Sequence, residues 1–123
     1  LEYETHDFIE NIDEYYQRCK ILISRAGAST ISESLFYQIP TIYFPISSSS
    51  GNHQYLNAKE ISKKNLGLIH TSDDSIELLS NDIYRILYDE DFYNTILESI
   101  RKDGYPNVNS ATRIIEEVYL DFK

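Results

Sequence analysis

Short apolar runs alternate with longer amphipathic segments along the first part of the chain. Lys20–Ser24 and Thr41–Phe44 are rich in β-branched or aromatic residues and bounded by polar turns, which is typical of buried strands. Leu1–Thr5 and Leu68–His70 have the same character. The pattern therefore predicts four strands.

Segments of helical length lie between these runs and after the last of them. The predicted helices span residues 11–16, 28–38 and 53–64, followed by three helices marked by the apolar residues of 76–87, 92–100 and 111–118. Asn65 and Gly67 are expected to end the third helix, and Asp73 or Asp74 to cap the fourth. After His70 the pattern is helical only.

Strands that alternate with helices predict a parallel sheet covered on both faces, which is a Rossmann-like α/β fold. The length of 123 residues fits one domain and is too short for two. The chain begins with Leu1 rather than Met, so we expect it to be a piece of a longer protein.

Composition removes several classes of function. The net charge is -9 with only 11 Lys and Arg residues, so nucleic acid is not an expected partner. No apolar run approaches the roughly 20 residues that span a bilayer, so any membrane association is expected to be peripheral. Cys19 is the single cysteine, and we interpret it as a small buried thiol rather than a nucleophile. No catalytic triad, G-x-G-x-x-G or P-loop pattern occurs.

The turn after the second predicted strand has the features of an anion site. Gly27 lets a ligand approach the backbone, and the helix that begins near Ala28 directs unpaired N–H groups at it. Arg25 adds positive charge, and the hydroxyls of Ser29 and Thr30 add hydrogen-bond donors. These residues predict a diphosphate site.

Glu33 follows one helical turn later, and two interpretations of it stay open. It completes a capping box with Ser29 or Thr30, or its carboxylate accepts the hydroxyls of a ribose.

A second polar cluster, "GNHQYLNAKE", opens the helix after residue 52. His53, Gln54 and Asn57 offer neutral donors and acceptors, which suit the hydroxyls of a sugar, whereas the alternative is simple capping by Asn52. A metal site is not expected, because one His among amides is a weak ligand set. His6 and His70 are isolated, and we interpret them as structural or exposed.

Taken together, "SRAGASTISE", "IPTIYFP" and "NHQYLNA" resemble the donor-binding half of GT-B glycosyltransferases of the MurG-like family. The resemblance runs from about Phe8 to the C-terminus. It implies that the backbone of Ile9 pairs with uracil and that residues 27–30 bind the diphosphate. It further implies that Glu33 binds ribose, and that Gln54, with His53 and Asn57, reads the sugar.

The resemblance also implies a function. The family's type member transfers N-acetylglucosamine (GlcNAc) from UDP-GlcNAc to lipid I, undecaprenyl-diphosphate-muramoyl-pentapeptide, in peptidoglycan synthesis. No metal or other cofactor is expected if the helix terminus stabilises the diphosphate. We therefore expect residues 1–123 to be a partial donor-binding domain, a truncated C-terminal half of a GT-B fold without the N-terminal acceptor domain. No catalytic residue is expected in this segment, which alone is expected to bind a UDP-sugar weakly if at all and to be inactive as a transferase. The whole protein is expected at the cytoplasmic face of the membrane.

Other functions stay open on the sequence. A different acceptor is one, as in a glycolipid synthase or in a two-chain dolichol-linked GlcNAc transferase whose donor half is a separate polypeptide. A UDP-GlcNAc 2-epimerase shares the fold but needs acid and base residues that we do not find. A non-catalytic module that binds a nucleotide sugar is the alternative from another class.

Overall fold

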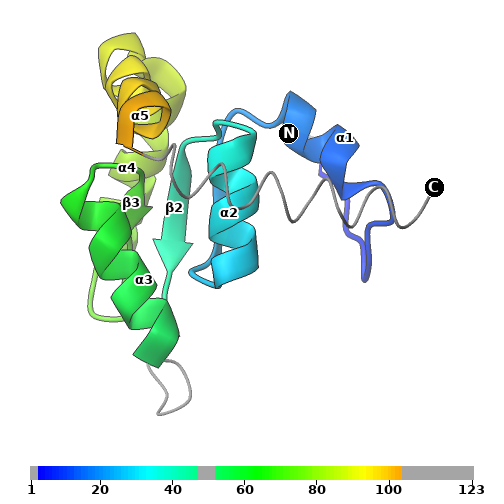
Figure 1. Cartoon of the computed structure of the whole chain (residues 1–123), viewed down its shortest axis with the longest axis horizontal. Helices are drawn as coiled ribbons and strands as arrows, with labels where there is room; N and C mark the ends of the chain where they lie inside the picture. The colour runs from blue at the N-terminus through cyan, green and yellow to red at the C-terminus, as the bar shows by residue number, and fades with distance from the viewer. Residues whose placement is uncertain (1–2, 47–51, 104–123) are drawn as a thin grey trace.

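The structure is a computed structural model that describes residues 3–46 and 52–103. Its elements are α1 (Ile12–Arg18), β1 (Leu22–Arg25), α2 (Ala28–Phe36), β2 (Thr41–Phe44), α3 (Asn52–Lys63), β3 (Leu68–Ile69), α4 (Ile76–Tyr88) and α5 (Glu90–Asp103) (Figure 1). The described strands form one parallel sheet in the order β1-β2-β3. The predicted α/β fold is confirmed.

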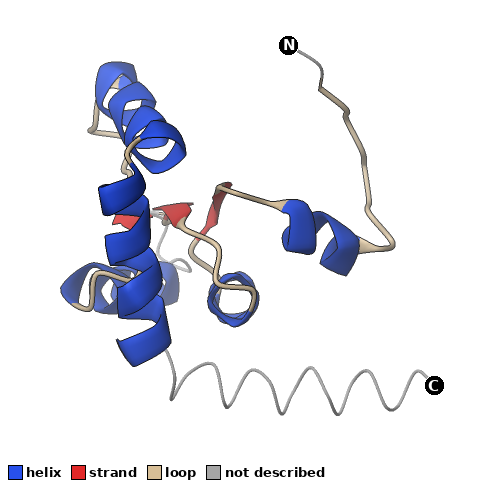
Figure 2. Cartoon of the chain, turned by 90° about the horizontal axis from the view of Figure 1, so that it is seen from above, coloured by secondary structure: helices blue, strands red, loops and turns tan. Residues whose placement is uncertain are grey.

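The topology of the sheet decides where the helices lie. Leu22 pairs with Thr41, and Ile42 pairs with Leu68, so both crossovers step across the sheet in the same direction. Right-handed crossovers of this kind place their helices on one face. Figures 1 and 2 show α2 and α3 together on one side of the sheet, α4 on the other, and α1 beyond the β1 edge. The N-termini of α2 and α3 therefore lie at the carboxyl edge of the strands.

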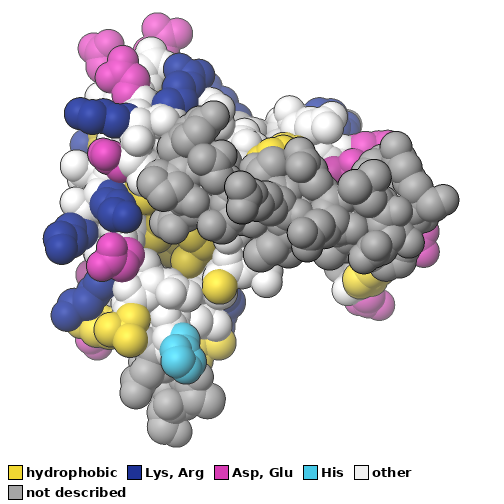
Figure 3. Space-filling view, in the orientation of Figure 1, with side chains coloured by type: hydrophobic (Ala, Val, Ile, Leu, Met, Phe, Trp, Pro, Cys, Tyr) yellow, Lys and Arg dark blue, Asp and Glu magenta, His cyan; other side chains and the backbone are white. Residues whose placement is uncertain are grey.

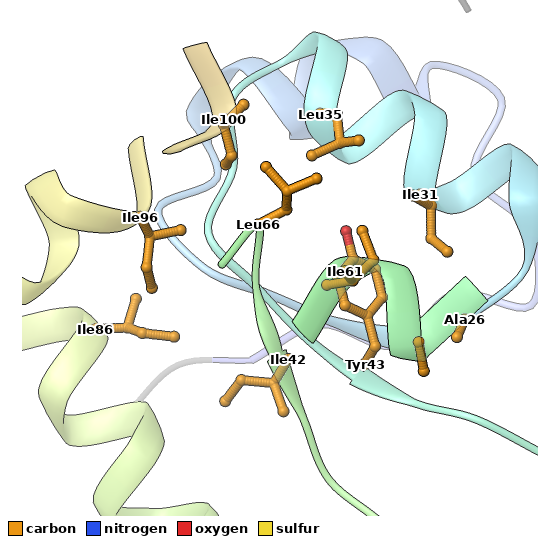
Figure 4. Close-up of a cluster of buried hydrophobic side chains, with 11 residues drawn as sticks. Ala26, Ile31, Leu35, Ile42, Tyr43, Ile61, Leu66, Ile86, Ile96 and Ile100 are labelled. Carbon is orange, nitrogen blue, oxygen red and sulfur yellow. The ribbon is translucent and has the colours of Figure 1, made fainter. Parts of the chain in front are cut away.

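Alternation along β2 fills the core on both faces of the sheet. Tyr43 is fully buried on the face of α2, where its hydroxyl makes a hydrogen bond to Ser34. Its neighbour Ile42 points to the opposite face, toward Ile86 of α4 (Figure 4). Burying a side chain such as Ile42 contributes about 1.5–3 kcal/mol to stability. The central strand thus anchors helices from both layers.

The end of α3 is set by residues with special backbone or steric requirements. Asn65 has a φ of 56°, a left-handed conformation that terminates a helix, as predicted. Gly67 acts differently, because a Cβ at this position would lie 2.8 Å from both the carbonyl oxygen of Thr41 and the Cε2 atom of Tyr43. Only glycine lets the chain pass this close to β2.

The predicted strand Leu1–Thr5 is wrong over the residues that the structure describes. Tyr3–Thr5 belong to no strand, so the described sheet has three strands rather than four. Tyr3 is 83% exposed, and the backbone of this segment has no neighbouring strand among the described residues. Alternation over so short a run does not produce a strand unless a sheet edge pairs with it.

Two predicted helix ends also need correction. The helix expected over 28–38 ends at Phe36, because Gln38 adopts a left-handed φ of 55°. The cap of α4 is Ser75, whose Oγ accepts the N–H of Leu78 at 3.1 Å, and neither Asp73 nor Asp74 takes this role. Asp74 instead accepts the N–H of Thr71 at 2.8 Å. The helix predicted over 111–118 lies outside the described residues.

Candidate functional site: the carboxyl edge of the sheet

The turn between β1 and α2 presents an uncapped helix N-terminus. Gly27 is the N-cap, with φ -74° and ψ 148°, and no side chain among residues 3–46 and 52–103 accepts a hydrogen bond from the first turn of α2. A Cβ at Gly27 would meet no atom of the described residues within 4 Å, so these residues leave the space beside the turn open on this side. Unpaired N–H groups and the positive end of the helix dipole favour an anion at this place.

The polar side chains expected around this turn are available to a ligand. Arg25 and Ser29 are exposed, and Thr30 is half-buried. Within residues 3–46 and 52–103, Arg25 takes part in no ion pair. Ala28 is exposed as the first residue of α2. Residues 25–30 thus combine backbone donors, hydroxyls and one cation, which is the donor set of a phosphate site.

The first turns of α3 are tied to this turn and to the end of β2. The Nδ2 atom of Asn57 donates to the carbonyl of Ala26 at 3.2 Å, and the Oε1 atom of Gln54 accepts the N–H of Ile46 at 3.0 Å. His53 is exposed beside them. The structure therefore brings His53, Gln54 and Asn57 to the same edge as Gly27. Two of the three predicted sugar-binding groups already use one atom each to hold the backbone.

Glu33 is not part of a capping box. It lies beyond the first turn of α2, which contains no acidic residue, and its Oε2 atom accepts the hydroxyl of Tyr16 at 2.9 Å. The capping interpretation is therefore wrong, and the carboxylate points toward α1. Burial raises the pKa of the Tyr16 phenol well above its usual range, and the hydrogen bond to Glu33 raises it further.

Sequence reasoning missed Tyr16, because the hydrogen bond joins side chains 17 positions apart in two different helices. The sequence contains 11 tyrosines, and no local pattern distinguishes this one. Ile9 precedes α1 and is half-buried. Its backbone groups make no hydrogen bond to another described residue, and its expected contact with uracil stays a prediction.

The remaining candidates have structural surroundings. The Cys19 thiol donates to the carbonyl of Ile21 at 2.8 Å, and burial raises its pKa, which keeps the thiol protonated. His70 is only 6% exposed, with its ring 4.7 Å from that of Phe44 and no partner for Nδ1 among the described residues. His6 is exposed beside Glu4. Cys19 precedes β1, whereas His70 directly follows β3 and lies at the carboxyl edge, buried against Phe44 at the end of β2.

Two further observations concern only the part of the chain that is described. Its His, Cys, Asp and Glu side chains form no group of three or more that would hold a metal ion. Its helices are each too short or too polar to cross a membrane.

On the face in Figure 3, basic and acidic side chains alternate along the edge formed by α3 and α5. That edge therefore shows no extended patch of like-charged side chains on this face.

Similar proteins place the chain in a family. The sequence matches the glycosyltransferase family 28 C-terminal domain over residues 1–117. A relative from Thermosipho melanesiensis is 37% identical, and the match covers 79% of this chain and 31% of that protein. A relative from Rickettsia massiliae is 33% identical, with 96% of this chain and 32% of that protein covered. Both are named UDP-N-acetylglucosamine–N-acetylmuramyl-(pentapeptide) pyrophosphoryl-undecaprenol N-acetylglucosamine transferase.

The chain spans about a third of the length of these relatives. Among solved structures, the spinosyn forosaminyltransferase SpnP superimposes with a TM-score of 0.56 at 14% identity, over 97% of this chain and 33% of that one. This likeness supports the predicted GT-B type of α/β fold. The family match and the relatives confirm the resemblance carried by the motifs. The chain therefore belongs to the glycosyltransferase family 28 C-terminal domain family.

Proposed function

We propose that this chain is the donor-binding part of an inverting glycosyltransferase that moves GlcNAc from UDP-GlcNAc to lipid I in peptidoglycan synthesis. The printed names of the relatives support this reaction. The matched segment is about a third of the length of these relatives. We therefore assign the acceptor-binding site and the catalytic base to the other two thirds of such an enzyme. Residues 1–123 then act as a partial UDP-sugar domain.

The uncapped N-terminus of α2 is the observation that carries the proposal. It lies at the carboxyl edge of a parallel sheet, where ligands of such folds bind, and a glycine opens the approach to its N–H groups. The net charge of -9 makes the whole molecule a poor partner for an anion, so a diphosphate needs local donors of this kind. Arg25, Ser29 and Thr30 supply the remaining contacts.

We assign the other parts of the donor to the remaining candidate residues. Glu33 lies one helical turn from the diphosphate site, at the place for the ribose hydroxyls. His53, Gln54 and Asn57 open α3 and take the sugar, since Asn57 bonded to Ala26 keeps α3 beside the turn. The backbone of Ile9 takes the uracil edge.

The chemical role of this half is to stabilise the leaving group. In a single displacement at the anomeric carbon, the acceptor oxygen forms the new bond while the bond to UDP breaks, and negative charge grows on the diphosphate. Fixed N–H groups and Arg25 meet that charge without rearrangement, which is electrostatic preorganisation. The acceptor is lipid-linked, so the whole protein works at the inner surface of the cytoplasmic membrane as a peripheral protein.

Calorimetric titration with UDP-GlcNAc, UDP-glucose and UDP tests the proposal. We expect the wild-type chain to bind all three ligands, with UDP-GlcNAc preferred over UDP-glucose. Glu33→Ala removes charged hydrogen bonds and is expected to weaken each by about 10- to 100-fold. Exposed Glu60→Ala on α3 is the control and leaves binding unchanged. Equal binding of UDP to wild type and Glu33→Ala would contradict the assignment of the ribose site.

A further inference from the structure

The Tyr16–Glu33 pair links α1 to the carboxylate proposed to hold ribose. The phenol oxygen lies 2.9 Å from Oε2 of Glu33, within hydrogen-bond distance. A glutamate side chain has three rotatable bonds, so a carboxylate without a fixed partner samples several rotamers. No basic side chain pairs with Glu33 among the described residues. Its orientation there depends on Tyr16.

Tyr16 is itself held in place and can only donate. Its ring is half-buried, and its centroid lies 5.3 Å from that of Tyr37 at the end of α2. Because burial raises the pKa of Tyr16, the phenol keeps its proton throughout the physiological range. A neutral phenol next to a carboxylate donates its O–H and leaves the carboxylate charged.

The bond leaves the carboxylate with capacity for a ligand. An ionised carboxylate offers about four lone-pair sites on its two oxygens, and Tyr16 occupies one of them on Oε2. Oε1 accepts no hydrogen bond from another described residue. The free oxygen and the remaining sites match a pair of neighbouring hydroxyls, which is the pattern that ribose offers and 2′-deoxyribose lacks.

We propose that Tyr16 is a positioning residue, which holds the Glu33 carboxylate so that it selects ribonucleotides over 2′-deoxyribonucleotides. The inference rests on the proposed function, since it assumes that Glu33 faces the ribose of the donor. It adds a residue from α1 to a site otherwise formed by Ile9, the end of β1 and the first turns of α2 and α3.

Tyr16→Phe is the test, because it removes the hydroxyl and keeps the ring against Tyr37. We expect it to weaken UDP binding about three- to tenfold and to change 2′-deoxy-UDP binding by less than twofold. Tyr37→Phe is the matched control: its ring packs on that of Tyr16, but its hydroxyl donates to no described residue. It leaves the preference of UDP over 2′-deoxy-UDP unchanged. A purely structural role of Tyr16 would weaken both nucleotides alike.

A double-mutant cycle separates this inference from the proposed function. If Tyr16 acts through Glu33, adding Tyr16→Phe to Glu33→Ala causes no further loss of UDP affinity. If Glu33→Ala weakens UDP binding but Tyr16→Phe does not, the positioning role is overturned and the proposed function stands. If the folded wild-type chain binds no UDP, or Glu33→Ala has no effect on it, the ribose assignment fails and the inference with it.

Discussion

Gly27 and Gly67 lack a side chain for opposite reasons. At Gly67 a Cβ would collide with backbone and ring atoms 2.8 Å away, so the glycine serves packing against β2. At Gly27 a Cβ would meet nothing within 4 Å, and its φ of -74° is open to any residue. Neither packing nor backbone conformation requires the glycine at position 27. The proposed diphosphate site supplies a reason for the glycine, because a side chain at position 27 would compete for access to the N–H groups of α2.

Gly27→Ser separates the stability of α2 from its function. Serine is at least as good an N-cap as glycine, so we expect the free energy of unfolding to stay the same or to rise by about 0.3 kcal/mol. The serine oxygen accepts the N–H groups that the diphosphate needs, so UDP binding is expected to fall about tenfold or more. Urea denaturation and calorimetry measure the two effects. A variant that is both stable and fully competent in UDP binding would contradict the phosphate site.

Single residues of the site were predictable where the chemistry is local. Gly27, the helix start at Ala28 and the polar opening of α3 follow from short patterns, and the structure brings them to one edge. Glu33 was a candidate, but local sequence did not decide between capping and ligand binding. The hydrogen-bond partner of Glu33, Tyr16, comes from another helix. Contacts of this kind depend on tertiary packing, which the periodicity of apolar residues in the sequence does not encode.

At the scale of elements, the type of each described helix was predictable and its ends were less so. Apolar spacing identifies α4, yet three candidate capping residues, Asp73, Asp74 and Ser75, precede it in the sequence. All three are good N-caps by propensity. Asp74 is taken by the turn that begins at Thr71, whose N–H and Oγ1 both donate to its carboxylate. The competition between two local structures thus decides the cap.

Ser75→Ala tests this choice of cap. The substitution leaves the N–H of Leu78 without its side-chain acceptor and is expected to lower the free energy of unfolding by about 1 kcal/mol. Asp73→Ala, at an exposed position outside the helix, should change it by less than about 0.5 kcal/mol. Chemical denaturation followed by circular dichroism gives both values. A larger loss for Asp73→Ala than for Ser75→Ala would show that the cap is Asp73 after all.

At the scale of the whole molecule, three tyrosines link stability to alkaline pH. Burial raises the pKa values of Tyr16, Tyr37 and Tyr43 above the ordinary value in the unfolded chain, which is about 10. Their contribution to stability is complete below that value. As the pH rises above it, the unfolded chain releases these protons first, and stability falls.

We therefore expect the urea midpoint to fall slightly above about pH 8.5, where the unfolded chain releases the proton of Cys19, and to fall more steeply above about pH 10 as the tyrosines contribute. Tyr16→Phe removes one of the three groups and is expected to make this fall shallower. Denaturation curves at a series of pH values measure it, with Tyr3→Phe as the control because Tyr3 is 83% exposed. An unchanged slope in Tyr16→Phe would mean that its phenol titrates normally in the folded chain.

The uncapped turn at Gly27 has a consequence for how such a domain changes through mutation. In the proposed donor complex, its main contacts to the diphosphate are backbone N–H groups, which no ordinary side-chain substitution removes, since only proline lacks the N–H. In the same proposal the sugar contacts side chains at the start of α3, and each of these is replaceable by a single codon change. Recognition of the diphosphate, which nucleotide sugars have in common, therefore depends on the backbone and resists substitution. Sugar specificity depends on side chains and changes more readily by mutation.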